Sequence, residues 1–371
     1  MEMLKFAAVK KPKVNFWIFF LMLLLVGLGC MFVYSASFYS AEITYGDKFF
    51  FLKKQLFGVG VGLAVYFFFS FFDYQKFKKI SPIIYTIGVI LLALVFVPGV
   101  GLKNYGATRW INLRFITFQP SEIAKISFII IASSILSKRS ESIKSFKGIF
   151  LILLLGGIYC ALIILEPNMS ITICMALLVV VMLFLGGAKL KHFLILLVPA
   201  ILMVVLLIVI EPYRLKRLVA FLDPFASKQN EGFQLVQSIL GISLGGAFGS
   251  GIFKSRQKYL FLPFSESDFI FAIIAEEVGF VGALCLILIF LCLFILILKV
   301  AKHSNDKFGF FISAGIGSLI IIQVLLNLGV CLGLLPPTGL PLPFISAGST
   351  SIMIFMGMVG IVQNIYKQSR G

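Results

Sequence analysis

Charge is scarce in this 371-residue sequence: Asp, Glu, Lys and Arg make up 13% of it, whereas hydrophobic residues make up 60%. Mean hydropathy is +1.08. So few charges among apolar runs of about twenty residues exclude an ordinary soluble protein and predict membrane-spanning segments. The apolar runs are continuous rather than alternating, which excludes a membrane β-barrel and favours helices.

Sequence patterns for bound cofactors are missing as well. There are two histidines and six cysteines, and no cysteine pair has the spacing of a metal site or a redox motif. Glycine-rich phosphate loops and nucleophile elbows are absent too. No cofactor is therefore certain from the sequence.

Ten apolar stretches are long enough to predict transmembrane helices. The expected spans are 16–35, 56–72, 82–98, 122–137, 149–165, 169–187, 193–210, 268–299, 308–334 and 344–366. We therefore expect an all-α, polytopic integral membrane protein. It would be one transmembrane domain over residues 1–371, with a large outer loop at 211–267 between the seventh and eighth spans.

Basic residues predict the orientation. Every loop expected on the side of the N-terminus is basic, as are both chain ends; examples are Lys76, Lys138, Lys189 and Lys299. The positive-inside rule then places both termini in the cytoplasm. The outer loops are also basic, which suits an anionic, phosphate-bearing ligand. Attraction to anionic membrane lipids explains this charge equally well, and no nucleic-acid partner is expected.

The first polar group of residues precedes and enters the fourth span: Arg109, Trp110, Ser121, Glu122 and Lys125. We expect Ser121 to cap the helix, and Glu122 and Lys125 to share a helix face. A lysine in the apolar layer costs ~2.5–3.5 kcal/mol at mid-membrane and normally faces a wet cavity or an acid. A purely structural Glu122–Lys125 pair is the alternative, and Trp110 could be an interfacial anchor.

Two further groups lie near the same expected membrane surface. Asp268 sits where the outer loop becomes the eighth span, which suits a base or a metal ligand; a helix-start acid is the alternative. Glu276 and Glu277 point to different sides of this helix, so we expect a packing role for at least one. In the ninth span Gln323 and Asn327 precede a proline-rich turn and a run of small residues.

Together these stretches resemble the SEDS family (shape, elongation, division and sporulation), and its FtsW/SpoVE branch most. The matching pieces run in order across almost the whole chain: 34–37, 106–110, 118–125, 166–168, 232–238, 255–263, 268–271, 276–277 and 333–346. The resemblance implies a bacterial enzyme of the cytoplasmic membrane that polymerises lipid II on the outer face. It also implies a class B penicillin-binding transpeptidase as partner. Asp268 matches the family's essential outer-face aspartate, and Glu122 and Lys125 match its polar cavity.

The chain departs from the family pattern at several positions near this aspartate. Phe264 and Glu266 stand where the family commonly has a glutamate and a histidine. Ala347 and Ser349 fall in what is usually a Tyr-Gly-Gly sequence, and Arg114 replaces a frequent glycine. Because Asp268 is retained, activity is still expected.

The implied reaction joins a GlcNAc 4-hydroxyl to the anomeric carbon of a MurNAc diphosphate-lipid, with inversion. Asp268 is the candidate base, with Lys125 and Glu122 as further catalytic residues. A divalent metal such as Mg or Mn, held by Asp268, could assist positive side chains at the diphosphate. The expected substrate-binding residues are Arg109, Trp110, Arg214, Arg256, Lys258, Gln237 and Ser346. The rival functions are a lipid II flippase and a non-catalytic scaffold for a penicillin-binding protein.

Overall fold

The computed structural model describes residues 14–104, 107–112, 117–138, 146–210, 212–226, 232–337 and 339–370. Helices of the described chain match the ten expected ranges. They are α1 (Phe16–Tyr45), α2 (Phe50–Phe71), α3 (Gln75–Leu94), α4 (Pro120–Lys138), α5 (Phe146–Leu165), α6 (Met169–Leu185), α7 (Leu190–Ile210), α10 (Ile270–Lys302), α11 (Lys307–Cys331) and α12 (Ser349–Arg370).

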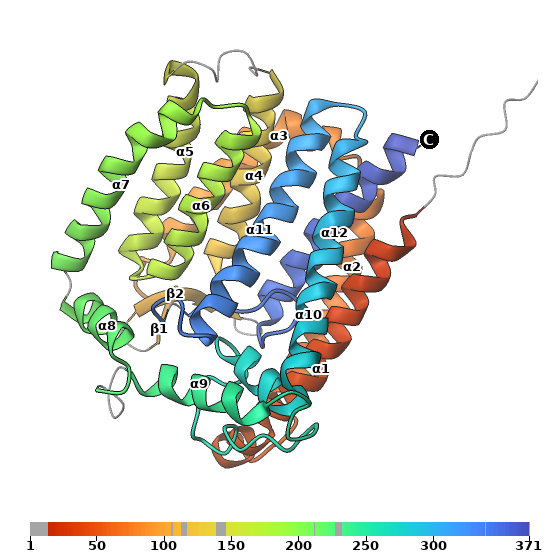
Figure 1. Ribbon diagram of the computed structural model, residues 1–371. Helices are drawn as coiled ribbons and strands as arrows, with labels where there is room; N and C mark the ends of the chain where they lie inside the picture. The colour runs from red at the N-terminus through yellow and green to blue at the C-terminus, as the bar shows by residue number, and fades with distance from the viewer. Residues whose placement is uncertain are drawn as a thin grey trace, which may run out of the picture.

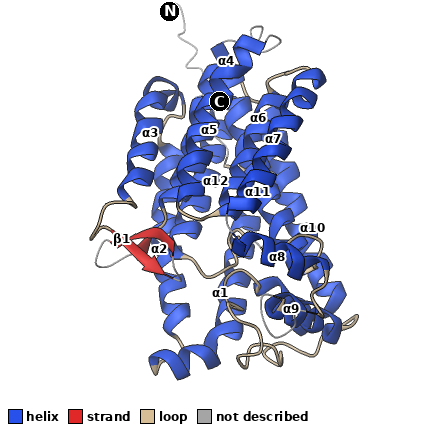
Figure 2. Ribbon diagram, turned by 90° about the vertical axis from the view of Figure 1, so that its left-hand side faces the viewer, coloured by secondary structure: helices blue, strands red, loops and turns tan. Residues whose placement is uncertain are grey.

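These helices stand side by side as a bundle, and smaller elements gather at one end of it (Figures 1 and 2). That end carries an antiparallel sheet of β1 (Gly101–Asn104), β2 (Ala107–Asn112) and β3 (Thr117–Phe118), in the order β1-β2-β3. It also carries α8 (Pro212–Leu222) and α9 (Phe233–Gly245), which lie within the predicted outer loop. The start of α1 and the end of α12 lie at the opposite end (Figure 1). We call the end with the sheet the loop end.

Eight helices within the described residues are long and apolar enough to cross a membrane, and α6, at 17 residues, is shorter. The all-α, polytopic membrane fold is thus confirmed. The number of ten crossings, the single-domain organisation and the side of the membrane on which the termini lie stay predictions.

Helix α1 is longer than its apolar run predicted. Asn15 caps its start, accepting a hydrogen bond from the N–H of Ile18 at 3.3 Å. It continues to Tyr45, where Gly46, at φ 69°, ends it in the left-handed conformation. Hydropathy could not reveal this continuation because residues 36–45 mix polar and apolar side chains. The last turns of α1 therefore project into the loop end.

Helices α2 and α12 approach each other so closely at several glycines that a side chain there would clash with the backbone of the other helix. A methyl group on Gly360 would lie 2.5 Å from the carbonyl oxygen of Tyr66, and one on Gly58 would lie 2.7 Å from the Cα of Ser349. Small residues allow such close approach between membrane helices. The first residues of α12 are thereby held firmly at the loop end.

Helix α10 is broken near the loop end by Gly279, whose φ is 68°. The break leaves two carbonyls and two N–H groups without their helical partners, and residues 246–251 pair with all four. The bonds are Ser250 N–H to Glu276 O (2.9 Å), Gly251 N–H to Glu277 O (3.0 Å), Phe280 N–H to Gly246 O (2.9 Å) and Val281 N–H to Ala247 O (3.1 Å). The first turns of α10 are thus joined to the outer loop.

The predicted orientation can be checked with single cysteines at two exposed lysines. Lys79→Cys lies in the first turns of α3, at the end predicted to be cytoplasmic. Lys254→Cys lies in the loop end. In intact cells an impermeant thiol reagent should label Lys254→Cys and spare Lys79→Cys, because the positive-inside rule puts the latter inside. The background is the protein with its six native cysteines replaced. Equal labelling of both positions would contradict the orientation.

Candidate functional site

Hydrogen bonds to three successive residues hold the backbone at Asp268. Successive carbonyls of Glu266, Ser267 and Asp268 each accept a bond from α11 or from the segment that follows it. The donors are the N–H of Ala347 (2.8 Å), the hydroxyl of Ser346 (2.6 Å) and the amide of Asn327 (2.8 Å), in that order. The position of Asp268 is therefore fixed by parts of the chain far away in sequence.

Asp268 is not the N-cap residue of the helix that follows it. Helix α10 begins at Ile270, and its N-cap residue, Phe269, makes no side-chain capping bond. Asp268 is half-buried, and Gly339, at φ 71°, lies against it. A methyl group on Gly339 would lie 3.0 Å from the Asp268 Oδ2. The glycine thus leaves room beside the Asp268 carboxylate.

Glu122 and Lys125 form a fully buried ion pair in the first turns of α4. The Nζ of Lys125 lies 2.7 Å from the Glu122 Oε1 and 2.9 Å from the Gln323 Oε1. The other oxygen of Glu122 has no hydrogen-bond partner among the described residues. The predicted cap at Ser121 is wrong, because α4 already begins at Pro120 and the Ser121 hydroxyl has no partner in the described chain.

Two amides on α11 connect this ion pair to Asp268. Gln323 accepts from Lys125 and donates to the carbonyl of Pro341 at 3.0 Å. Asn327, one turn later, donates to the carbonyls of Leu340 at 2.7 Å and Asp268 at 2.8 Å. The sequence showed both amides but did not place them in the site. Their spacing of four on an apolar helix is the signal that they share a face.

A second buried network joins the outer loop to α1 and α10 and includes Lys258. The Nζ of Lys258 lies 3.0 Å from the Glu277 Oε1, which also accepts from the Ser35 hydroxyl at 2.6 Å. Glu276 accepts from the Ser255 hydroxyl and, at 2.7 Å, from the backbone N–H of Arg256. Both glutamates therefore fasten the outer loop to α10, and the packing role expected for at least one is found for both.

Arg109 on β2 contacts the turn between α5 and α6. Its guanidinium donates to the carbonyls of Glu166, at 3.3 Å, and of Pro167. The Glu166 carboxylate is buried, and neither of its oxygens has a hydrogen-bond partner among the described residues. Burial raises the pKa of Glu166 to about 8, although the positive charge of Arg109 lowers it in part. A neutral Glu166 is thus favoured at pH 7.

The remaining predicted binding residues are spread over the loop end. Arg256 is exposed, Trp110 on β2 and Gln237 on α9 are half-buried, and Ser346 is buried. The side chain of Arg214 lies outside the described part of the structure. The geometry therefore brings Asp268, Ser346, Lys125 and Glu122 into one connected system. It leaves the roles assigned to the individual residues as predictions.

No group of three or more His, Cys, Asp or Glu side chains within the described residues could hold a metal ion. Magnesium, however, is often held by one or two carboxylates together with phosphate oxygens of a substrate. Asp268 as a single protein ligand fits that pattern.

The fold and this site define a multi-pass α-helical membrane protein with a charged cluster buried near one end of its bundle. The chain belongs to the FtsW/RodA/SpoVE family of cell cycle proteins, whose family model matches residues 15–371.

Two relatives cover almost the whole chain. Stage V sporulation protein E of Bacillus subtilis (strain 168) is 37% identical over 363 residues, which are 97% of this chain and 99% of that protein. The probable peptidoglycan glycosyltransferase FtsW of Geobacter sp. (strain M18) is 37% identical over 354 residues, which are 94% of this chain and 95% of that protein.

Solved structures share the fold. A chain from a peptidoglycan synthase complex that coordinates polymerization and crosslinking is 27% identical and has a TM-score of 0.81, covering 96% of this chain and 98% of that one. The rod shape determining protein RodA of Thermus thermophilus is 24% identical with a TM-score of 0.71, covering 96% and 98%. The latter likeness is one of fold.

Proposed function

We propose that this protein is a peptidoglycan glycosyltransferase that polymerises lipid II on the outer face of the bacterial cytoplasmic membrane. Family membership and a relative named as a probable peptidoglycan glycosyltransferase support the activity. The observation that carries it is the fixed Asp268 at the loop end, linked through α11 to the buried Lys125–Glu122 pair. The roles of these residues, the substrate and the membrane face belong to this proposal.

The reaction requires removal of a proton from a neutral sugar hydroxyl as that oxygen attacks the anomeric carbon. The C–O bond to the diphosphate breaks in the same step, so the α-linked donor becomes a β-linked product. Asp268 accepts the proton, because a positioned carboxylate can act as a general base. Fixing its backbone at three successive residues holds the base in one position, which is the geometric requirement for efficient proton transfer.

The leaving diphosphate needs positive charge near it. Lys125 supplies a buried charge, and Arg256 supplies an exposed one at the loop end. Magnesium or manganese, if bound by Asp268 and the diphosphate, would neutralise the same charge. Arg109 already contacts two backbone carbonyls. We therefore assign it two roles, which are to position β2 beside the site and to supply positive charge near the diphosphate.

The protein is proposed to work beside a class B penicillin-binding transpeptidase. Support comes from the similar chain found in a complex that both polymerizes and crosslinks peptidoglycan. A lipid II flippase and a non-catalytic scaffold are the competing functions. A flippase would place its acidic groups near mid-membrane, whereas Asp268 lies in the loop end, before the first residue of α10.

Purified protein incubated with lipid II, with and without the transpeptidase, tests the proposal. We expect uncrosslinked glycan strands, whose amount rises with time and with enzyme. A flippase would move labelled lipid II across a vesicle bilayer without making strands. A scaffold would give neither result, although it would bind its partner.

Arg256 provides a graded test of the anionic-ligand part of the proposal. Arg256→Gln should raise the lipid II concentration needed for half-maximal rate by roughly 1.4- to 5-fold, because an exposed charge contact contributes ~0.2–1 kcal/mol. The matched control is Lys254→Gln, which removes an exposed positive charge two residues away. Equal behaviour of the two variants would show that Arg256 acts through general surface charge, and the diphosphate would then be held elsewhere.

A further inference from the structure

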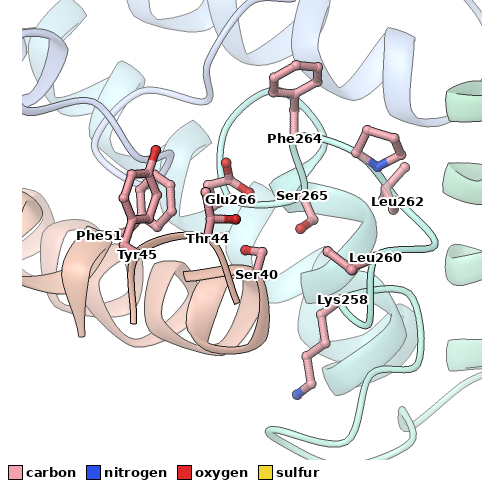
Figure 3. A pocket seen from close by; sticks show the side chains of 11 residues that line it. Ser40, Thr44, Tyr45, Phe51, Lys258, Leu260, Leu262, Phe264, Ser265 and Glu266 are labelled. Atoms are coloured by element: carbon pink, nitrogen blue, oxygen red, sulfur yellow. The ribbon is translucent and has the colours of Figure 1, made fainter. Parts of the chain in front are cut away.

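A cavity of about 330 Å³ lies at the loop end, beside the residues that lead to Asp268 (Figure 3). One wall is the last turns of α1 with Ser40, Thr44 and Tyr45, and the start of α2 adds Phe51. The facing wall belongs to residues 258–266 of the outer loop. The cavity thus depends on the continuation of α1 beyond its apolar run.

Its lining combines aromatic rings with hydrogen-bonding groups. Tyr45, Phe51 and Phe264 supply rings, and Glu266 supplies a carboxylate. Hydroxyl groups come from Ser40, Thr44 and Ser265. In Figure 3 the Glu266 side chain lies between the α1 wall and the loop wall. Such a lining suits a sugar, which offers C–H groups on its faces to aromatic rings and hydroxyls at its edge to a carboxylate.

Contacts of the lining residues with other parts of the chain fix the walls. The Ser265 hydroxyl donates to the carbonyl of Ala36 in α1 at 3.2 Å, which ties the loop to the α1 wall. The carbonyl of Glu266 accepts from the N–H of Ala347 at 2.8 Å. Lys258, which also lines the cavity, lies 3.0 Å from the Glu277 Oε1 of α10. The loop wall of the cavity is therefore held in place against α1, α10 and the segment that precedes α12.

Glu266 lies two residues before Asp268, so the two Cα atoms are at most about 7 Å apart. This separation is of the size of one ring in a sugar chain. The cavity volume of 330 Å³ lies at the lower limit of ligand pockets, which span about 300–1,000 Å³. The space suits one ring rather than a complete lipid-linked substrate.

We propose that this cavity binds one N-acetylhexosamine ring of the glycan strand, next to the ring that reacts at Asp268. The inference rests on the proposed function, because it takes Asp268 as the reaction centre. Binding here retains the strand between successive additions, so strand length depends on the cavity. Phe264 and Glu266, where the chain departs from the family pattern, then set how tightly this protein holds its strand.

The test fills the cavity and measures binding separately from turnover. Thr44→Trp places an indole at the cavity wall, whereas Ile43→Trp, at a neighbouring position that is 59% exposed and does not line the cavity, is the matched control. The probe is a soluble tetrasaccharide of alternating GlcNAc and MurNAc, bound to the full-length protein carrying Asp268→Asn. We expect Thr44→Trp to weaken binding at least tenfold and Ile43→Trp to leave it unchanged.

A second variant keeps the cavity open. Glu266→Gln retains the shape but loses the charge, and should weaken tetrasaccharide binding about tenfold, since hydrogen bonds to charged groups are the stronger ones. With Asp268 intact, both cavity variants should make shorter strands than wild type. Unchanged binding and strand length in both would overturn the cavity assignment while polymerisation stands. The protein could instead bind the tetrasaccharide through this cavity and make no polymer. That result would contradict the proposed polymerase function and still support the glycan-binding site.

Discussion

Replacing Asp268 by Asn is expected to abolish glycan synthesis while leaving the protein folded. Asn keeps the size of Asp but cannot accept a proton at neutral pH, and loss of a general base typically lowers the rate 10²–10⁴-fold, or ~3–5 kcal/mol. The fold should be retained because the main contact with Asn327 is made by the Asp268 backbone carbonyl at 2.8 Å, which the substitution leaves in place. The rate is measured as polymer formed from lipid II by equal amounts of purified protein.

The alternative role for Asp268, a helix-start acid, makes a different prediction. It would change stability by ~1 kcal/mol or less and leave the rate nearly normal, because Asn caps helices about as well as Asp. In the structure the N-cap residue of α10 is Phe269, one position after Asp268. Thermal unfolding of Asp268→Asn should therefore match wild type, and it should still co-purify with its transpeptidase. Near-normal polymer formation by this variant would contradict the catalytic role of Asp268. It would favour the flippase and scaffold hypotheses instead.

Lys125 is expected to give the second largest effect, on both folding and rate. Lys125→Met leaves Glu122 as an uncompensated buried acid and deprives Gln323 of its donor. Breaking a buried ion pair from one side costs ~3–5 kcal/mol. The single variant should therefore yield little folded protein, measured by its recovery as a monodisperse species in detergent.

A double variant separates the structural role of Lys125 from its role in the reaction. Lys125→Met with Glu122→Gln removes both charges, and such neutral replacements of buried pairs are often tolerated. We expect this variant to recover the folded yield but to polymerise lipid II about 10²–10³-fold more slowly, because a positive charge close to the leaving diphosphate is lost. If the folded double variant polymerised lipid II at the wild-type rate, the Glu122–Lys125 ion pair would have a structural role only.

Much of the fold could be predicted from the sequence because hydrophobicity in a membrane protein is a direct and strong signal. Long apolar runs gave the ten helix ranges, and backbone groups in lipid leave helices as the only solution for such runs. The last turns of α1, together with α8 and α9, were not predicted. They lie at the loop end, where polar and apolar residues mix and hydropathy distinguishes helix from loop poorly.

The candidate site could be predicted only residue by residue. Asp268 and Lys125 stand out because charge is costly where each is found. The link between them could not be predicted, since Gln323 and Asn327 act through carbonyls of residues 268, 340 and 341. Backbone carbonyls carry no side-chain identity, so a sequence does not reveal which of them an amide will meet. The ion pair of Lys258 with Glu277 is hidden for a related reason, since it depends on how the outer loop folds back on α10.

The break at Gly279 divides α10 into a short first helix and a long second helix. Its first part, from Ile270 to Val278, shares backbone hydrogen bonds with residues 246–251 and carries Asp268 just before its start. A methyl group at Gly249 would lie 2.1 Å from the carbonyl oxygen of Glu277, so a larger residue there must push this short helix aside. Substitutions at Gly249 or Gly279 would thus displace the Asp268 carboxylate from a distance. A lost activity in such variants would report misalignment of Asp268, and it would not place either glycine against the sugar chain.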